Sequence, residues 1–306
     1  MGGPCSGRPP TGLTASPTSG WCVAEAGAPR LGAFDRDTAV RRERAIGQEI
    51  VYSAEVSRDW RAGRGPHGGY LAAMLLRALL DTVADPERSP RSLTVHYPRA
   101  PEPGPVSIHT RIERQGRSLS TLSARMEQDG KLIALVLSAF SVAWSAPELS
   151  ELKMPNVPGP DAAREAGTLE KLGAPPFTRH LVMQPRIGGR PFAASAQPME
   201  IGGWLGLAEP RPIDPLSLAF FSDALFPPPF VRLREDQRVV APTIDLTIHF
   251  RARMPRAAEP DHDELCLARF RTRLVHEGFF DESGVIWAQD GSVLAQSRQL
   301  AILLPV

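Results

Sequence analysis

Three polar residues in the second half of the chain, Asp223, Thr243 and Gln299, could together hold and activate a water molecule. Asp223 lies in an otherwise apolar stretch, and a carboxylate in apolar surroundings is a stronger base than one in water. Thr243 and Gln299 cannot act as bases, but they can hold the same water if both lie within about 3 Å of one point. Each residue alone also fits an ordinary role, a partly exposed helix acid or a strand end. The residue types by themselves leave both roles open.

A second candidate feature is the sequence His67-Gly68-Gly69, which opens an apolar helical stretch. Backbone N–H groups at the start of a helix are unpaired and can bind a carbonyl oxygen that acquires negative charge. The alternative is that the two glycines only allow a sharp entry into the helix. Residues 63–68 also match G-x-G-x-x-G, but strands rather than a βαβ unit follow, so we do not expect a nucleotide site.

The elements that must position these residues occur twice. Residues 92–97, Ser-Leu-Thr-Val-His-Tyr, return as residues 245–250, Asp-Leu-Thr-Ile-His-Phe, and the turn Asp129-Gly130 returns as Asp290-Gly291. In each half an apolar helical stretch precedes a run of antiparallel strands. The chain therefore predicts an α+β fold of two tandem hotdog domains, a double hotdog. In each domain a long buried helix is wrapped by an antiparallel sheet of about five strands.

The predicted elements follow the same order in both halves. In the first half we expect a strand, a helix and four strands, at residues 48–56, 70–83, 92–97, 105–114, 118–128 and 131–142. In the second half we expect a strand at residues 177–183, then a loop containing Gly202-Gly203-Trp204, then a helix at 216–226 that contains Asp223. Four strands follow, at residues 242–251, 264–276, 279–289 and 292–304.

Composition divides the chain further. Residues 1–32 are rich in Gly, Pro, Ser and Thr and are predicted to be disordered. The N-terminal hotdog domain is expected at residues 33–144, a linker rich in Pro, Ala and Glu at 145–175, and the C-terminal hotdog domain with the catalytic residues at 176–306.

Charge and cysteine usage narrow the classes of partner. The 35 basic and 34 acidic residues give a net charge of +1, which provides no general attraction for nucleic acid or an anionic membrane. No window has the roughly 18 apolar residues of a membrane helix, so we expect a cytoplasmic protein with a small-molecule partner. Cys5, Cys22 and Cys266 lie far apart, and the run of residues 261–264 reads as a solvated loop. We therefore expect no metal and no cofactor.

Residues 48–304 resemble the double-hotdog acyl-CoA thioesterases of the thioesterase II type. The resemblance rests on Gly202-Gly203-Trp204, Ser222-Asp223, Pro242-Thr243-Ile244-Asp245 and Ala295-Gln296-Ser297-Arg298-Gln299. It implies hydrolysis of a fatty acyl-CoA to free fatty acid and CoA, with Asp223, Thr243 and Gln299 activating the water. The Thr-Ile-Asp-His of better-known members is Thr-Ile-Asp-Leu here, and Gln299 is followed by Leu300 rather than an acid. These differences bear on acyl-chain preference, which the sequence leaves open.

Three arginines, Arg251, Arg253 and Arg256, could receive the phosphates of CoA, because several guanidinium groups close together suit phosphate geometry. A solvated loop is at least as compatible with their spacing. The sequence also leaves open whether the chain forms a homo-oligomer.

The first half provides an internal comparison. Aligning His67 with Asp214 at the two helix starts places Leu76 opposite Asp223, and the strand repeats place Pro90 opposite Thr243 and Ser138 opposite Gln299. We therefore expect one hydrolytic site per chain, in the second half. Two other functions remain open: a non-catalytic acyl-CoA or lipid-binding protein, and a hotdog hydratase or dehydratase. The latter needs an Asp and His pair, and the second helix has no histidine beside its aspartate.

Overall fold

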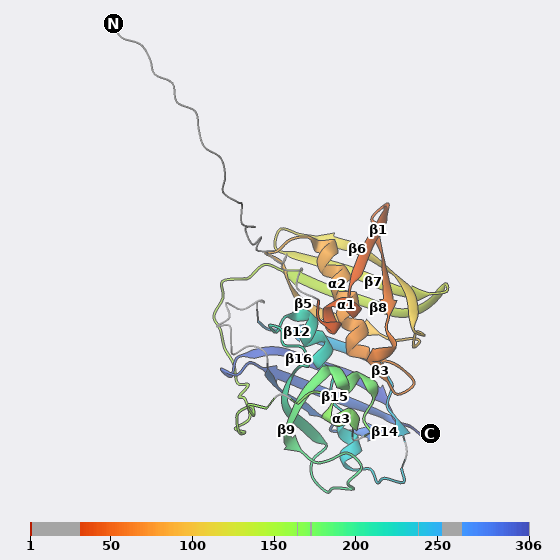
Figure 1. Cartoon of the computed structure of the whole chain (residues 1–306), viewed down its shortest axis with the longest axis vertical. Helices are drawn as coiled ribbons and strands as arrows, with labels where there is room; N and C mark the ends of the chain where they lie inside the picture. Colours follow the sequence, from red (N-terminus) through yellow and green to blue (C-terminus); the bar gives the residue numbers. More distant parts are fainter. Residues whose placement is uncertain (2–30, 164, 172, 238, 253–264, 306) are drawn as a thin grey trace. The chain divides into compact units, whose positions relative to one another are not determined.

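The computed structural model describes residue 1 and residues 31–305, apart from residues 164, 172, 238 and 253–264 (Figure 1). The elements below all belong to the compact unit Leu31–Val306. The predicted disorder of residues 1–32 concerns a segment that lies almost wholly outside the described residues.

An antiparallel sheet of 13 strands carries the fold. Its strands are, in the order in which they lie side by side, β1 (Val40–Ile46), β2 (Glu49–Val56), β6 (Gly104–Gln115), β7 (Leu119–Gln128), β8 (Lys131–Ser141), β5 (Ser89–His96), β12 (Thr243–Phe250), β16 (Val293–Ile302), β15 (Phe279–Trp287), β13 (Cys266–Arg271), β10 (Glu200–Leu207) and β9 (Leu181–Gly188), with β14 (Val275–His276) paired to β15.

Smaller elements connect these strands. Two short pairs are β3 (Arg61–Ala62) with β4 (Gly65–Pro66) and β11 (Val239–Val240) with β17 (Leu304–Pro305). The helices are α1 (Ala33–Asp37), α2 (Gly68–Val83), α3 (Thr168–Lys171) and α4 (Pro215–Phe221), and the 3₁₀ turns are η1 (Arg58–Trp60), η2 (Pro176–His180) and η3 (Pro228–Val231).

The two halves of the sheet meet at β5 and β12, the two copies of the repeated sequence. These strands pair with Thr94 opposite Thr247, which occupy the same position of the repeat, and the two Oγ1 atoms lie 3.1 Å apart. The strand order is the same on both sides of the β5–β12 pair. On one side it is β8, β7, β6, β2 and β1, and on the other side it is the corresponding series β16, β15, β13, β10 and β9. The duplication is therefore a pseudo-twofold arrangement, and the predicted double hotdog is confirmed.

Helix α2 is the long buried helix of the first half (Figure 1). It begins after His67, whose Nδ1 atom accepts a hydrogen bond from the Tyr70 amide, and it ends at Ala84 in the left-handed region with φ of 47°. Most of its residues are buried, because apolar side chains occupy nearly its whole circumference. Each fully buried leucine contributes roughly 1.5–3 kcal/mol to stability.

The second helix is shorter than predicted, and Asp223 lies in the turn after it rather than within it. Helix α4 is capped by Asp214, whose carboxylate accepts from the Ser217 amide, and it ends at Phe221. The chain leaves the helix where the carbonyl oxygen of Asp223 turns to accept a hydrogen bond from His67. The prolines at residues 227–229 lack the N–H that a resumed helix would require.

The prediction that Gly202-Gly203-Trp204 lies in a loop is wrong, because all three residues belong to β10. A Cβ atom on Gly202 would collide with the carbonyl of Ala268, and one on Gly203 with the carbonyl of Gln184. The glycines thus permit the close approach of the neighbouring strands β13 and β9.

Three further differences concern strand boundaries. Strand β1 was not predicted and forms a hairpin with β2 through Gly47, whose φ is 60°. The predicted strand 264–276 is divided into β13 and β14, and the predicted strand 177–183 begins as η2 and continues as β9. The other predicted strands agree with the structure to within a few residues.

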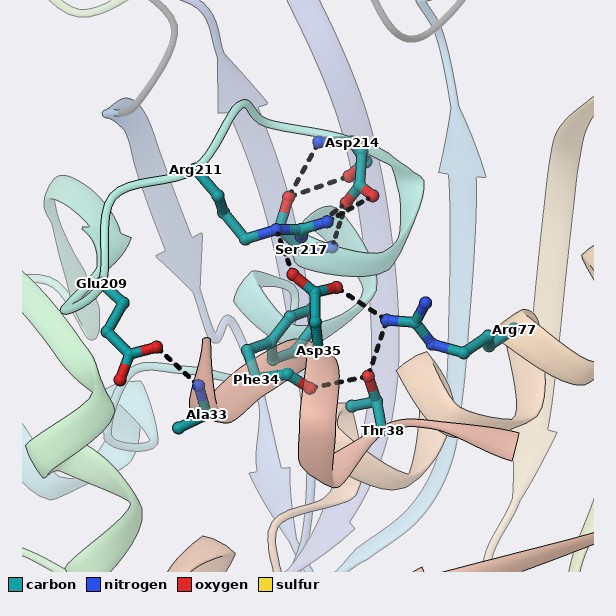
Figure 2. A network of polar contacts seen from close by, with 9 residues as sticks. All are labelled: Ala33, Phe34, Asp35, Thr38, Arg77, Glu209, Arg211, Asp214 and Ser217. Atoms are coloured by element: carbon teal, nitrogen blue, oxygen red, sulfur yellow. Dashed lines mark hydrogen bonds and ion pairs between the residues drawn. The ribbon is translucent and has the colours of Figure 1, made fainter. Parts of the chain in front are cut away.

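A polar network joins α1 to the regions of α2 and α4 that lie away from Asp223 (Figure 2). Asp35 of α1 forms ion pairs with Arg77 of α2 at 2.8 Å and with Arg211 at 3.1 Å. Arg211 in turn pairs at 2.9 Å with Asp214, the residue that caps α4. At the other end of the two helices, Gly69 packs against the Phe220 carbonyl. The network therefore stabilises the antiparallel contact of α2 with α4, which positions the residues described next.

Candidate active site

The Asp223 side chain is held at the N-terminus of α2. Its Oδ2 atom accepts a hydrogen bond from the Gly69 amide at 3.0 Å, and the side chain is 14% exposed. The unpaired amides at this end of a helix carry a partial positive charge, which favours a carboxylate. A residue of the second half is thus anchored by the helix of the first half.

His67 lies beside Asp223, but both nitrogens of its ring form hydrogen bonds with the backbone. Its Nδ1 atom accepts from the Tyr70 amide at 3.2 Å, and its Nε2 atom donates to the backbone oxygen of Asp223 at 2.7 Å. Burial lowers the pKa of His67, although the charge of Asp223 opposes the shift, so the ring is neutral at pH 7. Nε2 lies 3.6 Å from Oδ2 of Asp223, which is too long for a hydrogen bond.

The expectation that no histidine neighbours the aspartate is therefore wrong. The pair forms because the N-terminus of α2 packs against the end of α4, and the rings of Phe177 and Phe220 lie 4.2 Å and 5.0 Å from the His67 ring. No feature of the second-half sequence indicates this contact.

Gly68 and Tyr97 complete the surroundings of Asp223. The Tyr97 hydroxyl donates to the carbonyl of Gly68 at 2.9 Å, and burial together with the charge of Asp223 raises the pKa of Tyr97 well above 10. A Cβ atom on Gly68 would lie 2.8 Å from Oδ2 of Asp223, so a side chain at this position would displace the Asp223 carboxylate. The Gly69 amide is used by Asp223, whereas the Gly68 amide has no acceptor among the described residues.

The structure brings Gln299 and Thr243 together. The Nε2 atom of Gln299 donates to Oγ1 of Thr243 at 3.0 Å, across the adjacent strands β16 and β12. Gln299 is 6% exposed, and its Oε1 atom is buried without a hydrogen-bond partner in the described part of the chain. An acceptor left in this state is costly, which is typical of a site that binds something.

Glu282 lies beside this pair and was not identified from the sequence. It lies on β15 directly opposite Gln299 and is 6% exposed. Burial raises its pKa well above 4.5, and the charge of Asp223 adds to the shift. A signal was present in the sequence, because Glu282 interrupts the alternating apolar row that includes Phe280 and Ile286.

Sequence profiles of two domains match the chain. The profile of the acyl-CoA thioesterase N-terminal domain matches residues 56–142, and that of the acyl-CoA thioesterase C-terminal domain matches residues 155–303. The chain belongs to the acyl-CoA thioesterase family. It is also similar to Rv0499 of Mycobacterium tuberculosis, an uncharacterized protein, with 24% identity over 283 residues that cover 83% of this chain and 91% of the relative.

Solved structures share the fold of this family member. A hotdog protein of unknown function from Alicyclobacillus acidocaldarius has a TM-score of 0.76 and 29% identity, covering 90% of this chain and 100% of that one. The acyl-CoA thioesterase II TesB2 from Mycobacterium marinum has a TM-score of 0.68 and 20% identity, covering 90% and 99%.

The strand registers of the thioesterase fold support the internal comparison of the two halves. Gln299 is opposite Leu246, as Ser138 is opposite the matching residue Leu93. In the same way Thr243 is opposite Ala301, and its counterpart Pro90 is opposite Phe140. The first half therefore has no equivalent of the Gln299 and Thr243 pair.

The arginines predicted to bind CoA phosphates are only partly described. Arg251 is exposed at the end of β12, and its Nε atom donates to Oε1 of Gln296 at 2.7 Å. Arg253 and Arg256 lie outside the described residues. No hydrogen bond or ion pair recorded for Arg251 joins it to Asp223, Thr243 or Gln299. Phosphate binding by these residues stays a prediction.

A cavity of about 300 Å³ lies beside the rings of Trp60 and His180. Trp60 and His180, whose rings stack at 4.2 Å, line it together with residues 32–35 and 207–211. None of the described candidate site residues lines this cavity. We therefore assign no part of the thioesterase chemistry to it.

The substitution Gly69→Ala is expected to displace Asp223 and to destabilise the protein by about 1–3 kcal/mol. The added Cβ atom would lie 2.6 Å from the Phe220 carbonyl oxygen and 3.0 Å from that of Ala219, and backbone atoms cannot yield without moving α4. Thermal melting measures the effect. Gly159→Ala, where no atom lies within 4 Å of the added Cβ, is the control. Equal melting temperatures for the two variants would contradict the close-approach argument.

Proposed function

We propose that the chain hydrolyses fatty acyl-CoA thioesters to a free fatty acid and CoA in the cytoplasm, with Asp223 as general base. The observation that carries the proposal is the Gln299 and Thr243 pair, whose buried Oε1 atom lacks a partner in the described part of the chain. It lies in the half that also holds Asp223, which the Gly69 amide anchors. Family membership supports the same reaction.

In this mechanism the oxygen of water attacks the thioester carbonyl carbon while Asp223 accepts the proton that the water loses. Gln299 and Thr243 hold the water, and the Gly68 amide at the N-terminus of α2 donates to the oxyanion. The carbon–sulfur bond then breaks, and the proton held by Asp223 passes to the sulfur of CoA. The products are the carboxylic acid and the free thiol, with no metal or cofactor in the proposal.

A hydratase requires a histidine free to transfer a proton, and His67 does not meet this requirement. Both of its ring nitrogens are engaged, one by the Tyr70 amide and one by the Asp223 carbonyl, and the side chain is 3% exposed. Its contact with Asp223 therefore supports a structural role for the ring.

Steady-state hydrolysis of acyl-CoAs of different chain lengths, followed by detection of the free thiol, tests the proposal. We expect saturable turnover of at least one chain length, with kcat in the ordinary range of about 1–10³ s⁻¹. Matched pantetheine thioesters show whether Arg251, Arg253 and Arg256 recognise the nucleotide portion of CoA. Saturable binding of acyl-CoA without any turnover would replace the proposal by the non-catalytic binding alternative.

A further inference from the structure

Three buried polar side chains lie in one region of the second half of the sheet, and two of them, Gln299 and Glu282, belong to the candidate site described above. Thr272, Glu282 and Gln299 are 5%, 6% and 6% exposed, and Oγ1 of Thr272 and Oε1 of Gln299 have no partner among the described residues. Glu282 is directly opposite Gln299, and Thr272 follows Arg271, which is opposite Ser283. Gln299 and Glu282 therefore face each other across adjacent strands, and Thr272 lies just beyond the end of β13.

The corresponding positions of the first half are mostly apolar. Leu122 is opposite Ser138, as Glu282 is opposite Gln299, and Ile112 next to it corresponds to Thr272. Leu122 is fully buried, and so is Leu76, the counterpart of Asp223. The same fold thus accepts leucine where the second half buries a carboxyl group. Because burying a carboxyl group costs free energy that leucine does not, Glu282 calls for a functional reason.

The environment of Glu282 favours its uncharged form. Burial is the main reason that its pKa is raised well above 4.5, and the charges of Asp223, in the turn after α4, and of Asp281, on the same strand, raise it further. His67 and Tyr97 lie beside Asp223, and burial keeps both neutral at pH 7. No cation in the described part of the chain contributes to this pKa. In its uncharged form Glu282 is a carboxylic acid with an O–H group to donate.

We propose that Glu282 is a positioning residue for the hydrolysis, a role that rests on the proposed function: its O–H group donates a hydrogen bond to one lone pair of Oε1 of Gln299, and the second lone pair remains available to the water. Opposite residues of adjacent strands have Cβ atoms about 4.5–5.5 Å apart, within reach of such a bond. With Oε1 accepting from Glu282, the Gln299 amide has one orientation, and Nε2 remains bonded to Thr243. An ionised Glu282 accepts from Nε2 instead, so the amide turns over and Thr243 loses its donor.

The dependence of kcat/KM on pH tests this role. The wild type should lose activity at alkaline pH as Glu282 ionises, whereas Glu282→Gln, which cannot ionise and still has a donor, should lack this alkaline decline. Its kcat should fall by up to roughly tenfold, and that of Glu282→Leu, which has no donor, by roughly 10- to 100-fold. Asp281→Asn is the control and should retain the decline. An unchanged decline in Glu282→Gln, or a loss of turnover equal to that of Asp223→Asn, would overturn the proposal.

Thermal melts give a readout that does not depend on turnover. The folded state holds the Glu282 proton more tightly than the unfolded chain, whose pKa stays near 4.5, so this group stabilises the wild type least at high pH. The melting temperatures of Glu282→Gln and Glu282→Leu should therefore rise relative to the wild type as pH increases from 4.5 through the raised pKa. If the difference in melting temperature between the variants and the wild type did not change with pH, Glu282 would be ionised in the folded protein. A wild type that hydrolyses no acyl-CoA overturns the proposed function instead.

Discussion

Asp223→Asn is expected to lower kcat for acyl-CoA hydrolysis by roughly 100-fold or more, because in the proposed mechanism this carboxylate accepts the proton of water. Asparagine has nearly the same shape, and its carbonyl oxygen can still accept the hydrogen bond from the Gly69 amide that is 3.0 Å long in the wild type. The contact between α2 and the turn after α4 should therefore persist, and stability should hardly change.

The measurement is steady-state hydrolysis of a medium-chain acyl-CoA with detection of the free thiol, accompanied by a thermal melt of each protein. The thermal melt distinguishes a variant that has lost its general base from one that has unfolded. If Asp223→Asn retained most of the turnover of an active wild type, Asp223 could not be the general base.

Gln299→Ala is expected to have the next largest effect, a fall in kcat of roughly 10- to 100-fold. The variant removes the donor to Thr243 and the buried Oε1 atom together. Thr243→Ala should lower kcat in the same direction. In the proposed mechanism the three residues act on one water, so either variant should lower kcat much less in the Asp223→Asn background than in the wild type. Full additivity would mean that Gln299 and Thr243 serve a different step.

Ser138→Ala is the matched control, since Ser138 occupies the position of Gln299 in the first half. Its hydroxyl donates to the carbonyl of Ser92 at 2.6 Å, so the substitution should cost about 1 kcal/mol of stability. We expect kcat to stay at the wild-type value. A loss of turnover comparable to that of Gln299→Ala would contradict the expectation of one site per chain.

The sequence by itself determined the architecture, because the signals for it are local or repeated. The alternation of apolar residues predicts most strands to within a few residues, and the Asp129-Gly130 turn has the positive φ values of 51° and 70° that a tight hairpin requires. The duplicated segment predicts the pseudo-twofold arrangement, since two copies of one strand can pair about the same residue, as Thr94 and Thr247 do. The pairing of Thr243 with Gln299 also follows from strand order, because β12 and β16 are neighbours.

Only the tertiary structure decided what surrounds Asp223. Helix α2 packs against α4 and brings Gly69 and His67 to a residue 154 and 156 positions away in the chain. The same contact ends α4 earlier than its apolar pattern predicts, and it leaves Asp223 in the turn after the helix, where its charge raises the pKa of Glu282 on β15. Periodicity shows which face of an element is buried, but it does not show which buried faces meet. That choice depends on the side-chain volumes and close approaches of the whole core, and it converts Glu282 from an irregularity in an apolar row into a neighbour of the candidate site.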